Sequence, residues 1–385
     1  MEIIKGFRDI EDAGKKTVIR NIIEDIFSLY NYNPAETPII ENEDFVKGNN
    51  LNDEAVSSIF KLQDRGKRNL ALRYEFTFQL KRLANNKKLP YKRYQIGEVF
   101  RDEPTTGNRW REFTQCDVDV VGSDVKYEAE ILKISSMILK KLGIKFKINF
   151  NNRKLLNEII DDYNIKEVYR NEVIKEIDKL DKLSEKEVKE NLKKYGAEKI
   201  LGIFNKKEKY FEKYENYNEI KELKKICSFY KVKINFQPFL ARGLSYYNGS
   251  IFEIKSDKIK ETITAGGSYL VNGIQSTGIS FGLDRLESLA EIDFRKKKVL
   301  VISLNQDKKA FEISEKVRES GLGCSIFYGK PGKALDYANT YKINYVIFVG
   351  DNEIKNKKIN VKDMESGEEV QILVNSIEKY FKKTG

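Results

Sequence analysis

The segment KRYQIGEVFRDEPTTGNRWREFTQCDVDVVG, residues 92–122, predicts an antiparallel hairpin with a long tip. Its two ends are strand-like, and the polar stretch between them contains a proline and a glycine that suit a loop. Just upstream, the segment LALRYEFT alternates like a strand, and FQLKRLANNKKLP is helix-like. Residues 70–122 therefore carry the pattern of a sheet with one helix.

The second arm of this hairpin separates its side chains into two unlike faces. In a strand, successive side chains alternate, so one face carries Thr114, Cys116, Val118 and Val120, and the other carries Phe113, Gln115, Asp117 and Asp119. The first set is suited to a core. An aromatic ring, an amide and two carboxylates indicate either a polar pocket or the solvated outer face of an edge strand.

Helical and strand patterns extend in both directions from the hairpin. Apolar residues at helical spacing predict a helix over 18–30, which the prolines of NYNPAETPII end before an extended strand. Residues 152–232 are Lys- and Glu-rich and helical in pattern, which indicates an inserted helical module. Strand signals return in KINFQPF, SIFEI, ETITAGGSYL and TGISFG, and the last runs into a helix.

A fresh α/β alternation begins after FRKKK and predicts a separate C-terminal domain. The expected order is a strand at VLVISL, a helix over 306–319, a strand at CSIFY, a helix over 332–341 and a strand at NYVIFVG. A hairpin around 365–367 and a last helix follow. The fold class expected for the whole chain is α+β.

Composition limits the partners and the location of the chain. The net charge of +11 suits a polyanionic partner such as nucleic acid, although a Lys- and Asn-rich surface would give the same value. The chain has three cysteines far apart and no histidine, so we expect no structural metal and no disulfide framework. Neither a membrane span nor a secretory signal is visible, and we expect a cytoplasmic protein.

Arginines mark three places where phosphate could bind. Arg101, Arg109 and Arg111 belong to the hairpin tip, which could grip phosphates bidentately or be an ordinary solvated loop. Arg242 precedes the pair Tyr246 and Tyr247. Strand alternation would send these two rings to opposite faces, so we expect at most one of them to pack in the core.

The segment TGISFGLDRL combines glycines with a cation near a helix start. Gly278 and Gly282 allow close approach of the backbone, and Arg285 follows inside the helix, although tight strand–helix packing would leave the same pattern. Neither a Rossmann fingerprint nor a Walker P-loop occurs in the sequence. Any nucleotide must therefore be bound on another scaffold.

Taken together, the ordered motifs resemble those of histidyl-tRNA synthetases. The residues that carry the resemblance are LRYEFT (72–77), the 92–122 hairpin, ARGLSYY (241–247), AGGSYL (265–270) and TGISFGLDRL (277–286). The helix with its Pro38 strand, the arginine hairpin and the GLDRL helix are similar to motifs 1, 2 and 3 of class II synthetases. ARGLSYY resembles the histidine-site motif of this one family.

The resemblance implies a class II antiparallel catalytic sheet over 1–295, with the helical insertion at about 152–232, and a C-terminal anticodon-binding domain over 297–385. It implies a homodimer formed through motif 1. The implied reaction is ATP-dependent activation of histidine to histidyl-adenylate, followed by transfer to the 3′ end of tRNA(His). The implied catalytic residues, which act by positioning and charge, are Arg101, Arg242 and Arg285.

The resemblance also implies particular ligand contacts. ATP would be bound by Arg101, Glu103, Phe113, Arg242, Gly282 and Arg285, with Mg²⁺ bridging its phosphates. Histidine would be bound by Glu75, Thr77, Gln115, Asp119, Arg242, Tyr246 and Tyr247, with Asp119 and Tyr247 on the ring nitrogens. The tRNA acceptor end would meet Arg109 and Arg111, together with the Lys-rich insertion.

Three positions depart from the pattern of the family. Ser245 replaces an acidic residue, and Ser268 and Leu270 replace the arginine and aspartate of AGGRYD. We expect these changes to affect loop packing or tRNA contacts more than adenylation. The complete lack of histidine could spare synthesis of the enzyme from its own product, or could reflect drift.

Two rival functions are compatible with parts of this pattern. One is a non-catalytic paralogue that acts as a regulatory subunit in histidine biosynthesis, although such paralogues usually lack the anticodon domain and the three arginines. The other is a sister class II synthetase for proline, threonine or glycine, which would not be expected to carry ARGLSYY together with Asp119.

Overall fold

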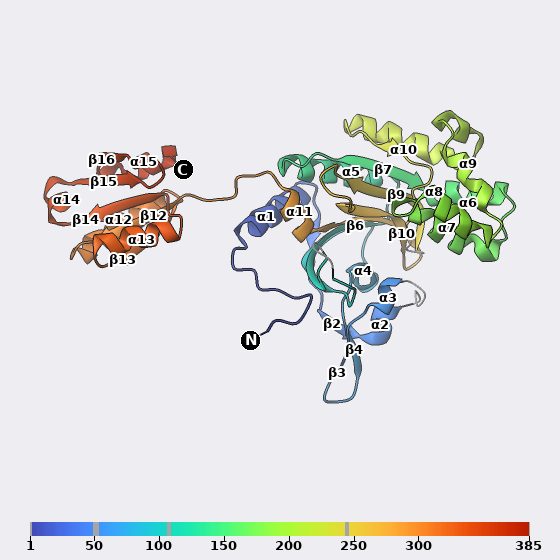
Figure 1. Cartoon of the computed structure of the whole chain (residues 1–385), viewed down its shortest axis with the longest axis horizontal. Coiled ribbons are helices and arrows are strands. Elements are labelled where there is room, and N and C mark those ends of the chain that lie inside the picture. The colour runs from blue at the N-terminus through green and yellow to red at the C-terminus, as the bar shows by residue number, and fades with distance from the viewer. Residues whose placement is uncertain (1, 49–53, 106–108, 243–245, 385) are drawn as a thin grey trace. The chain divides into compact units, whose positions relative to one another are not determined.

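The computed structural model describes residues 2–48, 54–105, 109–242 and 246–384. The chain forms two compact units, Met1–Ile292 and Asp293–Gly385, and each has its own sheet and core (Figure 1). Among the residues described, no helix is both long enough and apolar enough to cross a membrane. Ser245 lies outside the described residues.

The first unit is organised around an eight-stranded sheet of order β1-β5-β6-β11-β10-β9-β7-β8. The predicted hairpin is confirmed as β5 (Tyr91–Phe100) and β6 (Glu112–Val121), and from β5 to β7 all neighbouring strands of the sheet are antiparallel. Those partners are β11 (Ile274–Gly282), β10 (Thr264–Val271), β9 (Tyr247–Lys255) and β7 (Lys147–Asn152). The short strands β1 (Asn33–Pro34) and β8 (Asn235–Phe236) pair in parallel at the two edges.

Helices cover the apolar face of the central strands. The predicted first helix is α1 (Gly14–Leu29), which buries Ile19, Ile23, Ile26 and Phe27. It packs against α5 (Val125–Lys141) and α11 (Leu283–Leu289). Cys116, Val118 and Val120 of β6 are buried in the same core, as the strand alternation predicted.

Between β1 and β5 the chain forms a small three-stranded sheet, which includes the strand of the segment that resembles motif 1. It consists of β2 (Ile40–Asn42), β4 (Asn69–Leu72) and β3 (Lys61–Gln63), in that order. The helices around it are α2 (Glu43–Lys47), α3 (Glu54–Ser57) and α4 (Thr77–Leu83). The strand expected after Pro38 is therefore present, but only as the three residues of β2.

The expected helical insertion is confirmed. Residues 153–234, all of which the structure describes, contain helices and no strand. The α-helices are α6 (Arg153–Asp162), α7 (Arg170–Asp178), α8 (Glu185–Lys193), α9 (Leu201–Phe204) and α10 (Tyr217–Phe229). Their apolar faces join the core of the large sheet, and Figure 1 shows α6 to α9 gathered beside β9.

The second unit has the predicted alternation of strands and helices. Its sheet has the order β13-β12-β14-β15-β16, and the one helix that the pattern did not predict is α14 (Asp351–Asn356). The strands are β12 (Lys298–Ser303), β13 (Gly323–Tyr328), β14 (Tyr345–Val349), β15 (Lys358–Asp363) and β16 (Glu369–Leu373). The other helices are α12 (Asp307–Glu319), α13 (Pro331–Thr340) and α15 (Ile377–Thr384).

The core of the first unit predicts the effect of two phenylalanine truncations. Phe252 in β9 is 0% exposed, whereas Phe229 at the end of α10 is 71% exposed. We expect Phe252→Ala to lower the free energy of unfolding by about 3–5 kcal/mol, because it removes a ring from a packed core. Phe229→Ala is the matched control and should change it little. Urea denaturation of both variants measures this, and equal losses would contradict the assigned packing.

Candidate active site

β6 is an interior strand of the sheet, and the polar side chains on one of its faces are buried. These side chains are the centre of the candidate site. Antiparallel register places Arg93 of β5 and Gly278 of β11 on either side of Asp119. Asp117 and Gln115 follow along the strand, and the three polar side chains of β6 belong to residues that are only 3–5% exposed. The alternative of a solvated edge strand is therefore wrong, because β6 has a partner on both sides.

A fully buried guanidinium holds the inner end of this face. Arg93 is 0% exposed, and its Nη2 lies 3.0 Å from Asp119 Oδ2. The same nitrogen donates to the carbonyl of Phe76 at 3.2 Å. The Tyr269 hydroxyl donates to the other oxygen of Asp119. Asp119 thus has two buried partners, and neither was singled out in the sequence.

Gly278 gives Asp119 the room it needs. A Cβ at position 278 would lie 2.1 Å from Asp119 Oδ1. No side chain fits there while the carboxylate keeps its place, so the glycine is required by close approach rather than by an unusual backbone conformation.

The outer end of the face joins an arginine to an amide. The Arg101 guanidinium lies over the Phe113 ring, with Cζ 5.2 Å from the centroid. Arg101 Nη2 donates to Gln115 Oε1 at 3.4 Å, and its Nε donates to the carbonyl of Tyr74 at 3.1 Å. The structure therefore brings together Arg101, Phe113 and Gln115, which the sequence assigned separately to ATP and to histidine.

The hairpin tip holds its charges in internal pairs. Glu103 pairs with Arg109, and Arg111 Nη2 lies 3.1 Å from Asp102 Oδ1. Arg111 also donates to the carbonyl of Glu103 at 3.3 Å. The side chain of Arg109 is 56% exposed, whereas that of Arg111 is 30% exposed. Of the two, Arg109 presents more of its charge outward.

Arg285 joins this group of cations from α11. Its guanidinium donates to the carbonyl of Thr262. Burial lowers the pKa of Arg285, and the positive charges of Arg109 and Arg101 act in the same direction. Three arginines from two motifs therefore influence one another, which favours binding of an anion with several charges. At Gly282, which directly precedes the helix, a Cβ would have Arg285 Cβ as its nearest neighbour, at 3.8 Å. The backbone there is therefore uncrowded.

Arg242 occupies a separate acidic environment. Its Nη1 lies 3.2 Å from Glu253 Oε1, and its side chain is 29% exposed. Burial lowers the pKa of this guanidinium, but the nearby Tyr247, Glu253 and Asp178 outweigh that effect and the net shift is upward. Arg242 is thus fully charged, and its Nε has no hydrogen-bond partner among the described residues.

The two tyrosines after Arg242 do not alternate as predicted. Tyr246 and Tyr247 pack against each other with ring centroids 4.7 Å apart, and both belong to one apolar cluster. The prediction failed because β9 begins only at Tyr247, so Tyr246 lies in a turn where strand alternation does not apply. Tyr246 also contacts Tyr269, with centroids 5.7 Å apart.

Electrostatic contacts connect these rings to the remaining predicted residues. Burial raises the pKa of Tyr247, and the charges of Arg242, Glu75 and Asp117 act on the same hydroxyl. Glu75 lies in the half-buried segment before α4, and Thr77 is the first residue of that helix. Arg242, Glu75 and the two tyrosines therefore lie close enough to influence one another electrostatically.

Several residues of the site were not assigned a role from the sequence. They are Arg93, Asp117, Glu253, Tyr269 and Asp284. Asp284 accepts from Arg8 at 2.7 Å, from Lys16 at 3.1 Å and from the backbone of Thr114 at 3.1 Å, so it ties α11 to β6. Only the alternation of β6 could have indicated Asp117. The others depend on pairings between distant segments.

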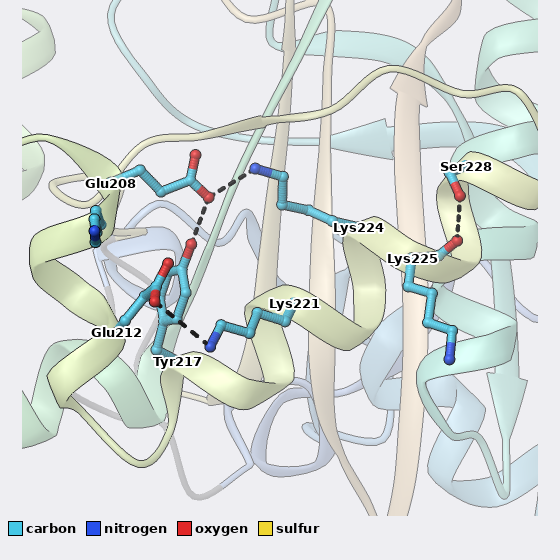
Figure 2. A pocket seen from close by; sticks show the side chains of 8 residues that line it. Glu208, Glu212, Tyr217, Lys221, Lys224, Lys225 and Ser228 are labelled. Atoms are coloured by element: carbon cyan, nitrogen blue, oxygen red, sulfur yellow. Dashed lines mark hydrogen bonds and ion pairs between the residues drawn. The ribbon is translucent and has the colours of Figure 1, made fainter.

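A concave surface lies in the helical insertion. It is an open groove of about 640 Å³ lined by Glu208, Lys209, Glu212, Tyr217, Lys221, Lys224, Lys225 and Ser228 (Figure 2). Lys224 and the Tyr217 hydroxyl converge on the Glu208 carboxylate at 2.7 and 2.6 Å. Figure 2 shows Lys225 pointing away from these pairs. Within the ranges described, no group of three or more acidic or cysteine side chains could hold a metal ion.

Comparison with known proteins agrees with this geometry. The family model described as histidyl-tRNA synthetase matches residues 6–286, and that described as an anticodon binding domain matches 298–384. A histidine–tRNA ligase of Bacillus cereus is 32% identical, covering 99% of this chain and 99% of its own length. One of Wolinella succinogenes is also 32% identical, covering 95% of this chain and 94% of its own length.

Solved structures show the same fold. Histidyl-tRNA synthetase from Nostoc superposes with a TM-score of 0.87 at 24% identity, covering 100% of this chain and 99% of its own. A protein from Bacillus halodurans, described as an ATP phosphoribosyltransferase regulatory subunit/histidyl-tRNA synthetase, superposes with a TM-score of 0.74 at 20% identity, covering 90% of this chain and 97% of its own.

The antiparallel sheet, the arginine-bearing hairpin and the second α/β unit define a class II aminoacyl-tRNA synthetase. The chain belongs to the histidyl-tRNA synthetase family, and its activity is the ligation of histidine to tRNA. The near-complete match to ligases does not favour the regulatory paralogue.

Removal of Arg93 should destabilise the protein in a pH-dependent manner. Burial raises the pKa of Asp119, and burial together with the Asp119 charge raises that of Asp117 to about 7, while Arg93 lowers both. Arg93→Leu leaves these carboxylates without their cation. Breaking such a buried pair costs about 3–5 kcal/mol.

The sign of the pH effect follows from the raised pKa values. The destabilisation by the two acids begins as the pH rises above their unfolded-state pKa, is fully present above their raised folded-state pKa, and is lost at low pH, where both states hold the protons. The stability loss of Arg93→Leu, measured by urea denaturation, should therefore be larger at pH 8 than at pH 5. Arg68→Leu, at an ion pair whose arginine is 78% exposed, is the control. A loss independent of pH would show that charge pairing is not the cause.

Proposed function

We propose that this ligation proceeds on the polar face of β6, where ATP and histidine bind at adjacent positions. The observation that carries the proposal is the continuous contact from Phe113 and Arg101 to Gln115, and from there to Asp117. The first half of this path suits a nucleotide and the second half an amino acid. Histidine would be activated to its adenylate and then transferred to the 3′ end of tRNA(His).

In this proposal ATP is bound by aromatic stacking and by charge. Phe113 stacks on adenine, Glu103 reads the adenine edge and Arg101 binds the α-phosphate. Arg285 takes the γ-phosphate end beside Gly282, where no side chain crowds the backbone. Glu103 pairs with Arg109, so in this proposal its carboxylate is shared between that arginine and the adenine edge.

Mg²⁺ would bind chiefly through the phosphates of ATP. The described residues contain no cluster able to hold a metal by protein ligands alone, and Mg²⁺ is ordinarily bound by one or two carboxylates together with phosphate oxygens and water. When bound, the ion would neutralise phosphate charge and orient the leaving pyrophosphate.

The histidine carboxylate would attack the α-phosphorus and release pyrophosphate, without a covalent intermediate on the enzyme. Negative charge that builds on the α-phosphate would be stabilised by Arg101 and Arg242. Arg242 suits this role because its raised pKa keeps the guanidinium protonated. In addition, its Nε has no hydrogen-bond partner among the residues described. Its ion pair with Glu253 would hold it in position.

The rest of the amino acid would be bound by a group of polar side chains. Glu75, Thr77 and Gln115 would bind the α-ammonium group and backbone, and Asp119 and Tyr247 the two ring nitrogens, with Tyr246 closing the pocket. A pocket that satisfies both ring nitrogens rejects amino acids that lack them, because its own polar groups would stay buried and unpaired.

The tRNA would contact three surfaces in this proposal. Arg109 and Arg111 of the hairpin tip would meet the acceptor end, and the second unit the anticodon. The groove of the insertion adds Lys209, Lys221, Lys224 and Lys225, which suit backbone phosphates (Figure 2). We further propose that the enzyme works in the cytoplasm.

A homodimer through motif 1 is part of the proposal. Apolar side chains are exposed in this region: Ile39 is 41% exposed, Ile40 in β2 is 50% exposed and Leu62 in β3 is 40% exposed. Neighbouring exposed apolar residues of this kind are typical of a surface that a partner covers.

Removal of the Arg242 charge should slow the activation of histidine. We expect Arg242→Gln to lower the kcat of histidine-dependent ATP–pyrophosphate exchange by about 10²–10³-fold, as removal of a transition-state donor does. Arg295→Gln, an exposed arginine outside the site, should leave it unchanged. Wild-type exchange that fails with histidine, or that proceeds equally with other amino acids, would refute the proposed activity itself.

Charge placed in motif 1 should break the dimer. Ile40→Asp is expected to give the monomer mass of 44.8 kDa in sedimentation equilibrium, where the wild type gives twice that value. Val168→Asp alters an apolar residue that is 73% exposed in the insertion and should keep the wild-type mass. A monomeric wild type, or a dimer that tolerates Ile40→Asp, would contradict this interface.

A further inference from the structure

Asp117 is a buried acid that the steps above do not use. Its residue is 4% exposed, and it lies on the interior strand β6 between Gln95 of β5 and Ser280 of β11. The charged or titratable groups around it are Asp119, Arg93, Tyr247 and Tyr269. A carboxylate in such a place is costly unless hydrogen bonds and charges around it compensate for the lost water.

Asp117 accepts hydrogen bonds from the Ser280 hydroxyl and from the side-chain amide of Gln115. Gln115 Nε2 donates to Asp117 Oδ1 at 2.9 Å and to Oδ2 at 3.1 Å. At the other end of the amide, Oε1 accepts from Arg101 Nη2 at 3.4 Å. A flipped amide would turn its oxygen toward a carboxylate and its NH₂ toward a guanidinium. Both contacts would be repulsive, so only one orientation satisfies the site.

This orientation decides what Gln115 can bind. An α-ammonium group has three donors and no acceptor, so it needs the amide oxygen and is repelled by the NH₂ group. The contact from Arg101 is long, and a carbonyl oxygen has two lone pairs, which leaves Oε1 able to accept a second hydrogen bond. The carboxylate behind Gln115 thus presents an acceptor to the amino-acid side of the site.

We propose that Asp117 is a positioning residue for histidine activation: it holds the Gln115 amide with its oxygen toward the α-ammonium group of the substrate. This inference rests on the proposed function, in which Gln115 binds that group. Asp117 itself need not touch histidine. It acts by fixing one orientation of an amide that would otherwise populate two.

The buried Asp117 carboxylate that fixes this orientation lowers the stability of the folded protein. A stability measurement can therefore distinguish a positioning role from a structural one. Burial and the neighbouring Asp119 raise the pKa of Asp117 to about 7, so the folded protein resists its ionisation. Asp117→Asn removes that cost and keeps the shape of the side chain. The variant should unfold at the same temperature as wild type or higher at pH 8, whereas a residue that only supports the fold would lower it.

The variant should weaken histidine binding selectively. An asparagine can present either its oxygen or its NH₂ to Gln115, so only the long contact from Arg101 at 3.4 Å still favours one orientation of the amide. We expect Asp117→Asn to raise the KM for histidine in ATP–pyrophosphate exchange by about 10-fold, the effect of one lost hydrogen bond to a charged group, with a much smaller change in kcat. Asp257→Asn, whose side chain is 83% exposed, is the matched control.

Two inhibitors test which part of the substrate is affected. Histamine keeps the ring and the ammonium group, and imidazolepropionate keeps the ring and the carboxylate. The inhibition constant of histamine should rise in parallel with the KM, and that of imidazolepropionate should stay near the wild-type value. Equal weakening of both would mean that Asp117 acts on the ring or on the fold, and would overturn the inference.

A double variant tests whether Asp117 acts through Gln115. If it does, Asp117→Asn should add almost nothing to the KM increase of Gln115→Ala, because the amide to be positioned is gone. Additive effects would overturn the inference, as would an unchanged KM in the single variant. Asp117→Ser repeats the test should the asparagine variant fail to fold, and failure of both would show a structural role. Wild-type exchange with histidine, measured alongside, keeps this outcome distinct from failure of the proposed function.

Discussion

One buried ion pair governs the arrangement of this site. Arg93 lies wholly inside the protein with its Nη2 3.0 Å from Asp119, and two of its nitrogens have no hydrogen-bond partner among the described residues. Such a guanidinium is tolerated only because carboxylates face it across the strands. In turn, the two acids of β6 can stay close together in a dry sheet only because Arg93 offsets part of their repulsion. The stability of this part of the sheet therefore depends on the balance of these three charges.

The other polar residues of the site follow Asp119 along β6. Each polar residue of this face is paired, in the antiparallel register, with a glycine or a small residue of β11. At Asp119 the space left by Gly278 is filled by the carboxylate itself, since a Cβ there would lie 2.1 Å from Oδ1. Asp284 then fastens α11 to β6 through the backbone of Thr114, so the helix that carries Arg285 keeps a fixed distance from the hairpin that carries Arg101. Arg101 directly follows β5 and Arg285 lies in α11, so the contact between α11 and β6 helps to position both.

The sequence predicted the elements well, and it predicted local faces better than long-range partners. Alternation in residues 113–120 correctly separated core from site because a long strand imposes a strict period of two. The same rule failed at Tyr246, which lies one residue before β9 begins. The roles of Arg93 and Tyr269 could not be predicted from the sequence, because their partner Asp119 lies on another strand. No local sequence pattern indicates which strands pair. The site residues named by resemblance remain proposals that kinetics must test.

The departures at Ser268 and Leu270 can now be placed in this framework. The Ser268 hydroxyl donates to Glu128 of α5, and Ser250 donates to the same buried carboxyl at 2.6 Å. Burial raises the pKa of Glu128, and the hydrogen bonds from Ser250 and Ser268 partly oppose that shift. Leu270 is 49% exposed. Tyr269, between these two positions, keeps its contact with Asp119, and a Cβ at the adjacent Gly267 would come within 2.9 Å of the Tyr247 ring. Ser268 and Leu270 thus bond to a helix or meet solvent, whereas Gly267 and Tyr269 keep their contacts with the site, which supports the expectation that the two substitutions leave adenylation largely unaffected.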